Sequence, residues 1–131
     1  MREVRVYSKS SEGEQKVSQH FRVREFACSD GSDAVFIDPE LVTVLQDIRS
    51  HFGRAVTVNS GYRTPEKNAA VGGAKQSRHL YGMAADITVK GVAPAAVAKY
   101  AETLLPGRGG IGIYAGFTHV DVREERARWQ G

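Results

Sequence analysis

The sequence predicts an α+β fold, in which a small antiparallel sheet is flanked by helices. Helical patterns precede and separate short strand patterns, which is the arrangement expected of this class. The chain has 131 residues, of which 41% are hydrophobic and 25% are charged. That length and composition suit one globular domain with a buried core.

The N-terminal region is expected to contain a strand and a polar loop. Residues 2–7 alternate enough to form a short strand, whereas residues 8–19 are polar and predict a loop. Residues 29–34 are expected to form a turn. We therefore assign residues 1–19 to a strand and loop that are part of the domain or appended to it, and residues 20–131 to a single domain.

The strongest helix pattern begins at Asp38, where an aspartate that can cap the helix precedes a proline at the first helical position. Gly53 is expected to end this helix. Between them, apolar residues recur at helical spacing, at Leu41, Leu45, Ile48 and Phe52. Residues 56–58, Val-Thr-Val, then predict a buried strand.

Glycines, prolines and short apolar runs divide the second half of the chain into short elements. Pro94 predicts the start of a helix that extends to about Leu105. The other expected elements are, in order, a short helix over 65–71, an irregular glycine-rich segment over 72–85, and strands over 86–89, 110–114 and 117–122, the last two joined at Ala115-Gly116.

Charge and composition argue against several classes of function. The net charge is +3, but the basic run at 123–128 is interleaved with two glutamates, which is typical of a solvated helix or tail. We therefore expect no nucleic-acid partner. No stretch approaches the roughly 20 apolar residues of a membrane span, so no membrane partner is expected either. The single Cys28 excludes an internal disulfide and a cysteine-based zinc site.

Residues 77–86 carry the most informative motif, S-x-H-x-x-G-x-A-x-D. The motif contains His79 and Asp86, and a second pattern, His119-Val-Asp, follows it. Two imidazole nitrogens and one carboxylate oxygen make a three-ligand set for a catalytic zinc, with the fourth position left to water. These three residues are therefore the candidate ligands of one Zn²⁺ ion.

The spacing of these residues constrains the backbone. On a straight helix His79 and Asp86 would lie about 10 Å apart along the axis, and on a strand more than about 20 Å apart. Both can reach one ion only if the chain folds back between them, and Gly82 supplies the freedom for that turn. His119 and Asp121 are expected to share one face of a strand, while the valines between and after them face the core.

Residues 107–112, Gly-Arg-Gly-Gly-Ile-Gly, match the G-x-G-x-x-G pattern of dinucleotide-binding proteins. That motif follows a strand and opens a helix, whereas here the expected order is reversed. We therefore interpret these glycines as a tight connection beside the site and not as a nucleotide-binding loop.

The motif at 77–86, together with Ser60-Gly61-Tyr62-Arg63 and a late histidine on a strand, resembles the zinc D-alanyl-D-alanine peptidases. That family includes VanY-type carboxypeptidases and phage endolysin peptidases. The resemblance is greatest to its compact branch and covers roughly residues 20–130. It implies a hedgehog/DD-peptidase-like fold and a zinc-dependent peptidase that cleaves bonds next to D-amino acids in peptidoglycan, with a zinc-activated water as nucleophile.

The resemblance also implies roles for individual residues. It implies that the three candidate ligands hold zinc, that Arg63 stabilises the substrate carbonyl or its oxyanion, and that Ser77 and Tyr62 contact the substrate. Many relatives carry an acidic residue three positions before the last histidine, where this chain has Gly116. Asp121 is the nearest candidate for the general base, or it instead orients an imidazole.

The missing acid at Gly116 leaves a second function open, that of a non-catalytic, zinc-containing module for cell-wall binding or phage structure. The expected partners are peptidoglycan stem peptides, and the expected oligomeric state is a monomer. Residues 1–7 lack the apolar core of a secretory signal. We therefore expect synthesis in the cytoplasm and action at the cell wall after release of the phage or prophage type.

Overall fold

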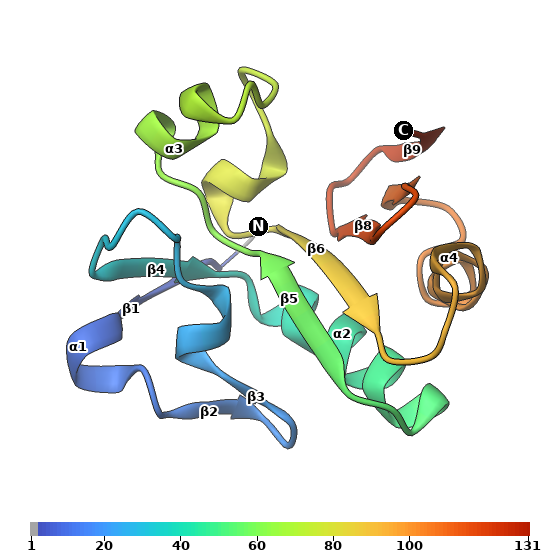
Figure 1. Ribbon diagram of the computed structural model, residues 1–131, viewed down its shortest axis with the longest axis horizontal. Helices are drawn as coiled ribbons and strands as arrows, with labels where there is room; N and C mark the ends of the chain where they lie inside the picture. The colour runs from blue at the N-terminus through green and yellow to red at the C-terminus, as the bar shows by residue number, and fades with distance from the viewer. Residues whose placement is uncertain (1–2) are drawn as a thin grey trace.

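The computed structural model, which describes residues 3–131, contains one five-stranded sheet and two small two-stranded sheets (Figure 1). The order of strands in the large sheet is β5-β6-β8-β7-β9. All its neighbours are antiparallel except β7 and β9, which run parallel. The α+β class is therefore confirmed. The bounds of these strands are β5 Val56–Ser60, β6 Ala84–Val89, β7 Gly109–Ile113, β8 Thr118–Asp121 and β9 Arg126–Gln130.

The N-terminal region is more ordered than the sequence predicts. Strand β1 (Arg5–Ser8) pairs with β4 (Ala34–Ile37), and β2 (Lys16–Ser18) pairs with β3 (Phe21–Arg22). Arg2, with which the predicted first strand begins, lies outside the described residues.

A short helix, α1 (Lys9–Glu12), lies between β1 and β2, so the predicted polar loop over 8–19 is wrong. Reciprocal caps explain this helix: the Ser8 side chain accepts a hydrogen bond from the Ser11 amide, and the Ser8 amide donates to the Glu12 carboxylate at 2.8 Å. The polar side chains of this segment thus provide hydrogen-bond partners for its own backbone amides.

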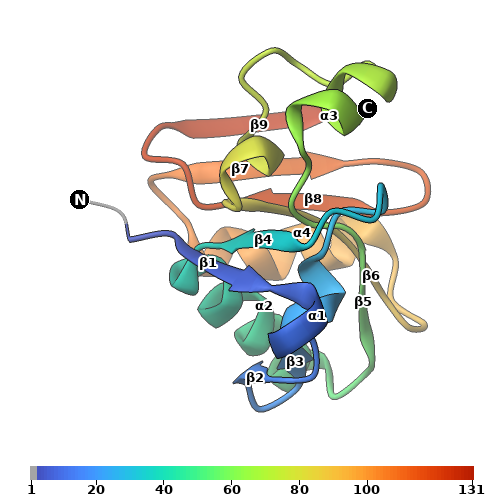
Figure 2. The ribbon, with the colours of Figure 1, turned by 90° about the vertical axis from the view of Figure 1, so that its left-hand side faces the viewer.

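Helix α2 (Pro39–Phe52) has the predicted bounds. The Asp38 side chain accepts from the Glu40 amide at 2.9 Å, and Gly53 ends the helix in the left-handed conformation at φ 61°. Its apolar stripe, buried except for the half-buried Phe52, packs against the sheet and against helix α4 (Pro94–Leu104), which covers β7 and β8 (Figure 2). These two helices and the sheet form the main core.

Strand β5 forms where it was predicted, but it is not a buried strand. Val56 and Val58 are half-buried and Thr57 is exposed. The reason is position, because β5 is an edge strand and pairs only with β6. Its C-terminal end leads to α3 (Pro65–Ala70) and then to a 3₁₀ helix, η2 (Arg78–Tyr81), within the segment predicted to be irregular. A second 3₁₀ helix, η1 (Val23–Phe26), follows β3.

The charged run at 123–128 is not a solvated helix or tail, because its second half belongs to strand β9. Arg128 forms an ion pair with Glu102 of α4 at 2.7 Å and donates to the Gly109 carbonyl, among others. Its charge is therefore neutralised within the fold. The next residue, Trp129, packs over β7 beside Gly112.

None of the helices in residues 3–131 is long and apolar enough to cross a membrane.

Candidate metal centre

The first candidate ligand, His79, is placed by η2 and by the turn that ends it. The Ser77 side chain accepts from the His79 amide at 3.2 Å and so caps η2. Gly82 follows in the left-handed conformation at φ 71°, and a Cβ there would collide with the Phe36 carbonyl. The predicted turn at Gly82 is confirmed, and it returns the chain toward β6.

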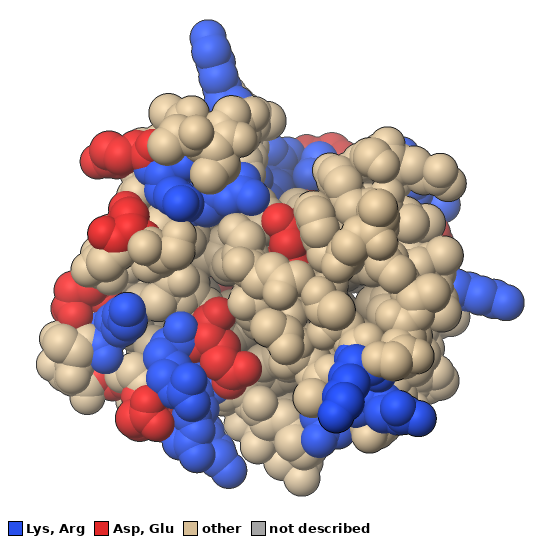
Figure 3. Space-filling view, in the orientation of Figure 1, with Lys and Arg blue, Asp and Glu red and all other residues tan. Residues whose placement is uncertain are grey.

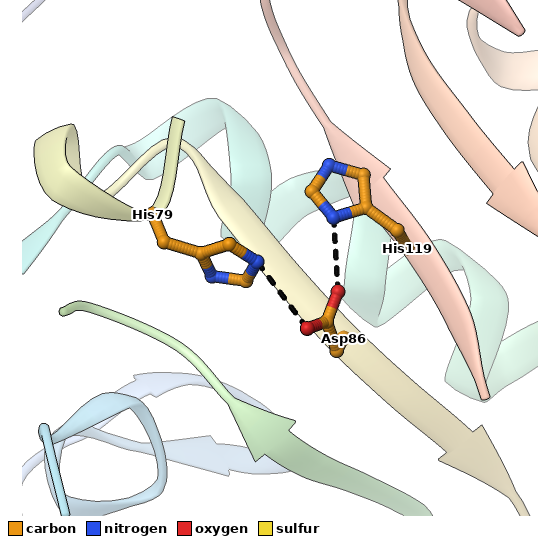
Figure 4. Close-up of side chains that lie close together, drawn as sticks. All are labelled: His79, Asp86 and His119. Atoms are coloured by element: carbon orange, nitrogen blue, oxygen red, sulfur yellow. Dashed lines mark hydrogen bonds and ion pairs between the residues drawn. The ribbon is translucent and has the colours of Figure 1, made fainter. Parts of the chain in front are cut away.

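Sheet register places the other two ligands. Asp86 on β6 lies directly opposite His119 on the neighbouring strand β8. Among the described residues, His79, Asp86 and His119 offer ligand atoms that all lie within 4.8 Å of one another (Figure 4). All three side chains are buried, with 2%, 8% and 8% of their residue surfaces exposed. The fold therefore brings together the three residues that the sequence predicts as metal ligands.

Each imidazole presents one nitrogen to Asp86 and the other to a second oxygen. Nε2 of His79 lies 3.3 Å from Oδ2 of Asp86, and its Nδ1 lies 2.8 Å from the Gly61 carbonyl. Nδ1 of His119 lies 2.9 Å from Oδ1 of Asp86, and its Nε2 lies 2.7 Å from Oδ2 of Asp121.

A neutral imidazole carries one N–H, so it can donate to only one of these two oxygens. When the nitrogen that faces away from Asp86 donates its N–H, the other nitrogen presents a lone pair to an oxygen of the Asp86 carboxylate. That contact is favourable only with an added proton or a cation between the two atoms. Two imidazole nitrogens and one carboxylate oxygen, with the second nitrogen of each imidazole hydrogen-bonded to another oxygen, match the surroundings of protein zinc sites. The site can therefore hold one metal ion.

The electrostatics of the cluster follow from its burial and its hydrogen bonds. Burial opposes ionisation of the Asp86 carboxyl, but bonds from His119 and His79 outweigh it and hold its pKa well below the usual range. Burial likewise disfavours the charged His119 imidazole, but bonds to Asp121 and Asp86 raise its pKa above the ordinary value. The centre thus favours an ionised carboxylate beside a cation.

Asp121 lies behind His119, and its side chain is fully buried. Oδ1 accepts from the Gly110 amide at 2.9 Å and from the amide and Nε of Arg123 at 3.1 and 2.8 Å. Oδ2 accepts from Nη2 of Arg123 at 2.6 Å and faces Nε2 of His119. Burial opposes ionisation, but these bonds, led by that of His119, hold the pKa of the Asp121 carboxyl well below its usual range. As predicted, Asp121 and His119 share a face.

A cavity of about 410 Å³ opens beside the three ligands. Arg63 and Ser77 line it, as do the ligands themselves, so five of the predicted site residues meet at one place. Arg63 extends Nη2 to within 3.4 Å of Oδ2 of Asp86. Tyr62 is not brought to the cavity wall, because its ring is buried and stacks on Phe36 with centroids 4.7 Å apart.

An aromatic wall of the cavity, formed by Tyr114, Phe117 and Trp129, was missed by sequence reasoning. The rings of Tyr114 and Phe117 stack at 4.4 Å, and Nε1 of Trp129 donates to the Tyr114 hydroxyl at 2.9 Å. Alternation along the predicted strand places Phe117 on the same face as His119, although Phe117 was not among the predicted site residues. Trp129 had no such signal, because it arrives on β9 through a parallel pairing with β7.

Three of the four glycines at 107–112 belong to strand β7, which lies beside the site, and none of the four opens a helix. Close approach explains two of them. A Cβ at Gly110 would lie 2.7 Å from Cγ of Asp121, and one at Gly112 would meet the Trp129 ring. These positions exclude side chains so that a carboxylate and an indole can pack against the strand.

Comparison with known proteins agrees with this geometry. Residues 19–121 match the peptidase M15 family. The chain is 50% identical over 50 residues to the zinc D-Ala-D-Ala carboxypeptidase of Streptomyces albus G, a match that covers 36% of this chain and 20% of that protein. It is 34% identical over 105 residues to the probable peptidoglycan L,D-endopeptidase MepK of Haemophilus influenzae, covering 72% and 55%. The chain thus spans about a fifth and about half of these two relatives.

Proposed function

The chain belongs to the peptidase M15 family, and we propose that it is a zinc-dependent peptidase that hydrolyses peptide bonds next to D-amino acids in bacterial peptidoglycan. The observation that carries the proposal is the buried group of two imidazoles and one carboxylate, each imidazole held from behind by a second oxygen. A cavity lined by cationic and aromatic side chains adjoins this group and can receive a peptide.

His79, Asp86 and His119 would hold the zinc ion. When bound, zinc supplies Lewis-acid polarisation of a carbonyl and a water whose pKa is lowered toward 7. Arg63 lies at the cavity wall beside Asp86, and Ser60 and Asn68 hold its guanidinium at 3.2 and 3.3 Å. A positioned guanidinium can stabilise the negative charge that develops on the scissile carbonyl oxygen. Ser77 fixes η2 at the mouth of the same cavity.

We assign Asp121 to the orientation of His119 and not to proton transfer from water. Its carboxylate is fully buried, does not line the cavity, and already accepts bonds from three other groups. A general base must come within hydrogen-bond reach of the proton it removes. A carboxylate that orients a ligating imidazole, in contrast, lies where Asp121 lies.

A second candidate function is a zinc-containing wall-binding or phage structural module without hydrolysis. One observation favours it: among the described residues that line the cavity, Asp86 is the only carboxylate. If zinc holds Asp86, no other cavity carboxylate is available to act as the base. Turnover therefore separates the two functions.

The finer points of the proposal concern partners and location. We propose that residues 20–131 form the peptidase domain, that the protein is a monomer, and that it acts on stem peptides at the cell wall without nucleic-acid or membrane partners. Release of the phage or prophage type would bring it there. Light scattering of the purified protein at several concentrations checks the monomer.

Metal analysis and muropeptide mass spectrometry test the function together. We expect one zinc per chain in the wild type and in His20→Ala, an exposed histidine outside the site, and little zinc in His79→Ala. Zinc-loaded wild type should release D-amino acids or new amino termini from purified wall, and Asp86→Ala should not. Absence of zinc from the wild type would refute the peptidase proposal, whereas zinc without turnover would support the non-catalytic module.

A further inference from the structure

Three arginines line the cavity beside the metal centre: Arg63, Arg78 and Arg123. Two of them are bound to buried carboxylates. Nη2 of Arg63 lies 3.4 Å from Oδ2 of Asp86, and Arg123 donates hydrogen bonds to the Asp121 carboxylate from two guanidinium nitrogens. Each of these two guanidinium groups therefore has a buried carboxylate that balances its charge.

Arg78 differs from the other two. Nη1 donates to the Gln76 carbonyl at 2.8 Å, and the nearest carboxylate oxygen among the described residues, Oε1 of Glu125, lies 4.0 Å from Nη2. The Glu125 side chain is 72% exposed, whereas that of Arg78 is only 24% exposed. A sheltered guanidinium thus lines the cavity with only a distant, solvated counter-charge. In the view of Figure 3, basic and acidic side chains lie close together near α3.

We propose that Arg78 forms a subsite for a carboxylate of the substrate peptide, an inference that rests on the proposed peptidase function. The planar guanidinium fork matches a carboxylate in shape and can donate two parallel hydrogen bonds to it. Glu125 is then the internal competitor that the substrate displaces. This subsite determines specificity and takes no part in bond cleavage.

Position ties the subsite to the reacting bond. Arg78 directly precedes the ligand His79 in η2, so a carboxylate bound there lies within about one or two residues of a carbonyl at the metal. The aromatic wall of Tyr114, Phe117 and Trp129 lines the same cavity and offers apolar contact to the rest of the peptide. A free C-terminal carboxylate and a side-chain carboxylate are the two sources of this chemistry.

Binding can be measured by a signal that is separate from cleavage, because Trp129 is the single tryptophan and lines the cavity. Zinc-loaded protein is titrated with a synthetic D-alanyl-D-alanine peptide that contains one D-glutamate. Two further peptides carry a carboxamide in place of either the C-terminal or the side-chain carboxylate. Tryptophan fluorescence reports the three affinities, and cleavage is followed separately by mass spectrometry.

We expect the wild type to bind one of the two carboxamides about 10- to 100-fold more weakly than the parent, which identifies the carboxylate that is recognised. Arg78→Gln should lose this discrimination, and Arg78→Lys should keep only part of it. Glu125→Gln should bind the parent a few-fold more tightly, about two- to fivefold. Lys75→Gln, an equal change of charge at an exposed position outside the cavity, should match the wild type.

Equal binding of the three peptides by the wild type, or full discrimination by a folded Arg78→Gln variant, would overturn the subsite. Failure of the peptidase proposal gives a different result, because the peptides would then bind with the same order of affinity and remain uncleaved. Circular dichroism of each variant confirms that the comparison is between folded proteins.

Discussion

Replacing Gly110 with alanine should displace the carboxylate that orients His119. A Cβ at this position would lie 2.7 Å from Cγ and 2.8 Å from Oδ1 of Asp121, and closer still to Oδ2. Ordinary contacts between such atoms are about 3.5 Å or longer, so the carboxylate must retreat by roughly 1 Å. Its bond to Nε2 of His119, now 2.7 Å, would then exceed the range of a hydrogen bond.

Two effects follow, one on stability and one on metal affinity. Overpacking at a fully buried position costs about 1–3 kcal/mol of the free energy of unfolding, because the neighbours of Asp121 must shift when its carboxylate moves. Loss of the partner behind a ligating imidazole lowers metal affinity about 10- to 100-fold, or about 1.4–2.7 kcal/mol. Thermal unfolding of the metal-free protein measures the first effect, and zinc titration against a competing chelator measures the second.

Gly107→Ala is the matched control, since it lies in the same glycine-rich segment and a Cβ there would meet nothing within 4 Å. We expect it to retain wild-type stability and zinc affinity. If a folded Gly110→Ala variant binds zinc within about twofold of this control, Asp121 does not orient His119. Asp121→Asn, which keeps the volume of the side chain, provides an independent measurement of the same role.

Three further outcomes are expected. Gly82→Ala should lower the free energy of unfolding by more than about 1–2 kcal/mol, because the φ of Gly82 is 71° and an added Cβ would collide with the Phe36 carbonyl. Gly72 has a similar φ of 70° but open space around it, so Gly72→Ala should destabilise less in thermal unfolding. Equal losses in the two variants would contradict the steric argument. Arg63→Lys should lower kcat about 100- to 1000-fold with zinc still bound, and a change in KM alone would refute its role at the oxyanion. Hydrogen bonds from Arg128 lower the pKa of the Glu102 carboxyl below its ordinary 4.5, so its contribution to stability is present above about pH 4.5 and is lost as pH falls through the lowered value. Glu102→Gln should therefore flatten the acid limb of the stability profile, and an unchanged profile would show that the ion pair contributes nothing.

Local patterns in the sequence identified the elements whose signals are short-range. Helix α2 was predicted because its cap, its first-turn proline, its apolar stripe and its final glycine all lie within its own sixteen or so residues. The ligand set was predicted for a related reason: residue type limits which side chains can bind zinc, and the spacing of His79 and Asp86 requires a turn that only Gly82 permits.

Other features depended on pairings between distant parts of the chain. Part of the polar segment at 8–19 becomes helical because, besides the local caps at Ser8, the distant Asp33 carboxylate accepts hydrogen bonds from the Ser8 hydroxyl at 2.7 Å and from the Ser10 amide at 2.8 Å. The second half of the run at 123–128 becomes part of a strand because it pairs with β7, and Glu102, on another element, neutralises Arg128. Hydrophobic periodicity carries no information on either effect, since both arise from polar groups that meet specific partners.

The sequence by itself therefore determined the chemistry of the centre: two imidazoles, one carboxylate, a nearby arginine and the turn that joins them. Tertiary structure alone decided what surrounds that chemistry. Burial placed Asp121 behind His119, where we propose that it orients the imidazole, and the parallel pairing of β9 with β7 brought Trp129 to the cavity. The physical reason is that residue type sets what a group can donate or accept, whereas exposure and partners depend on which strands lie side by side.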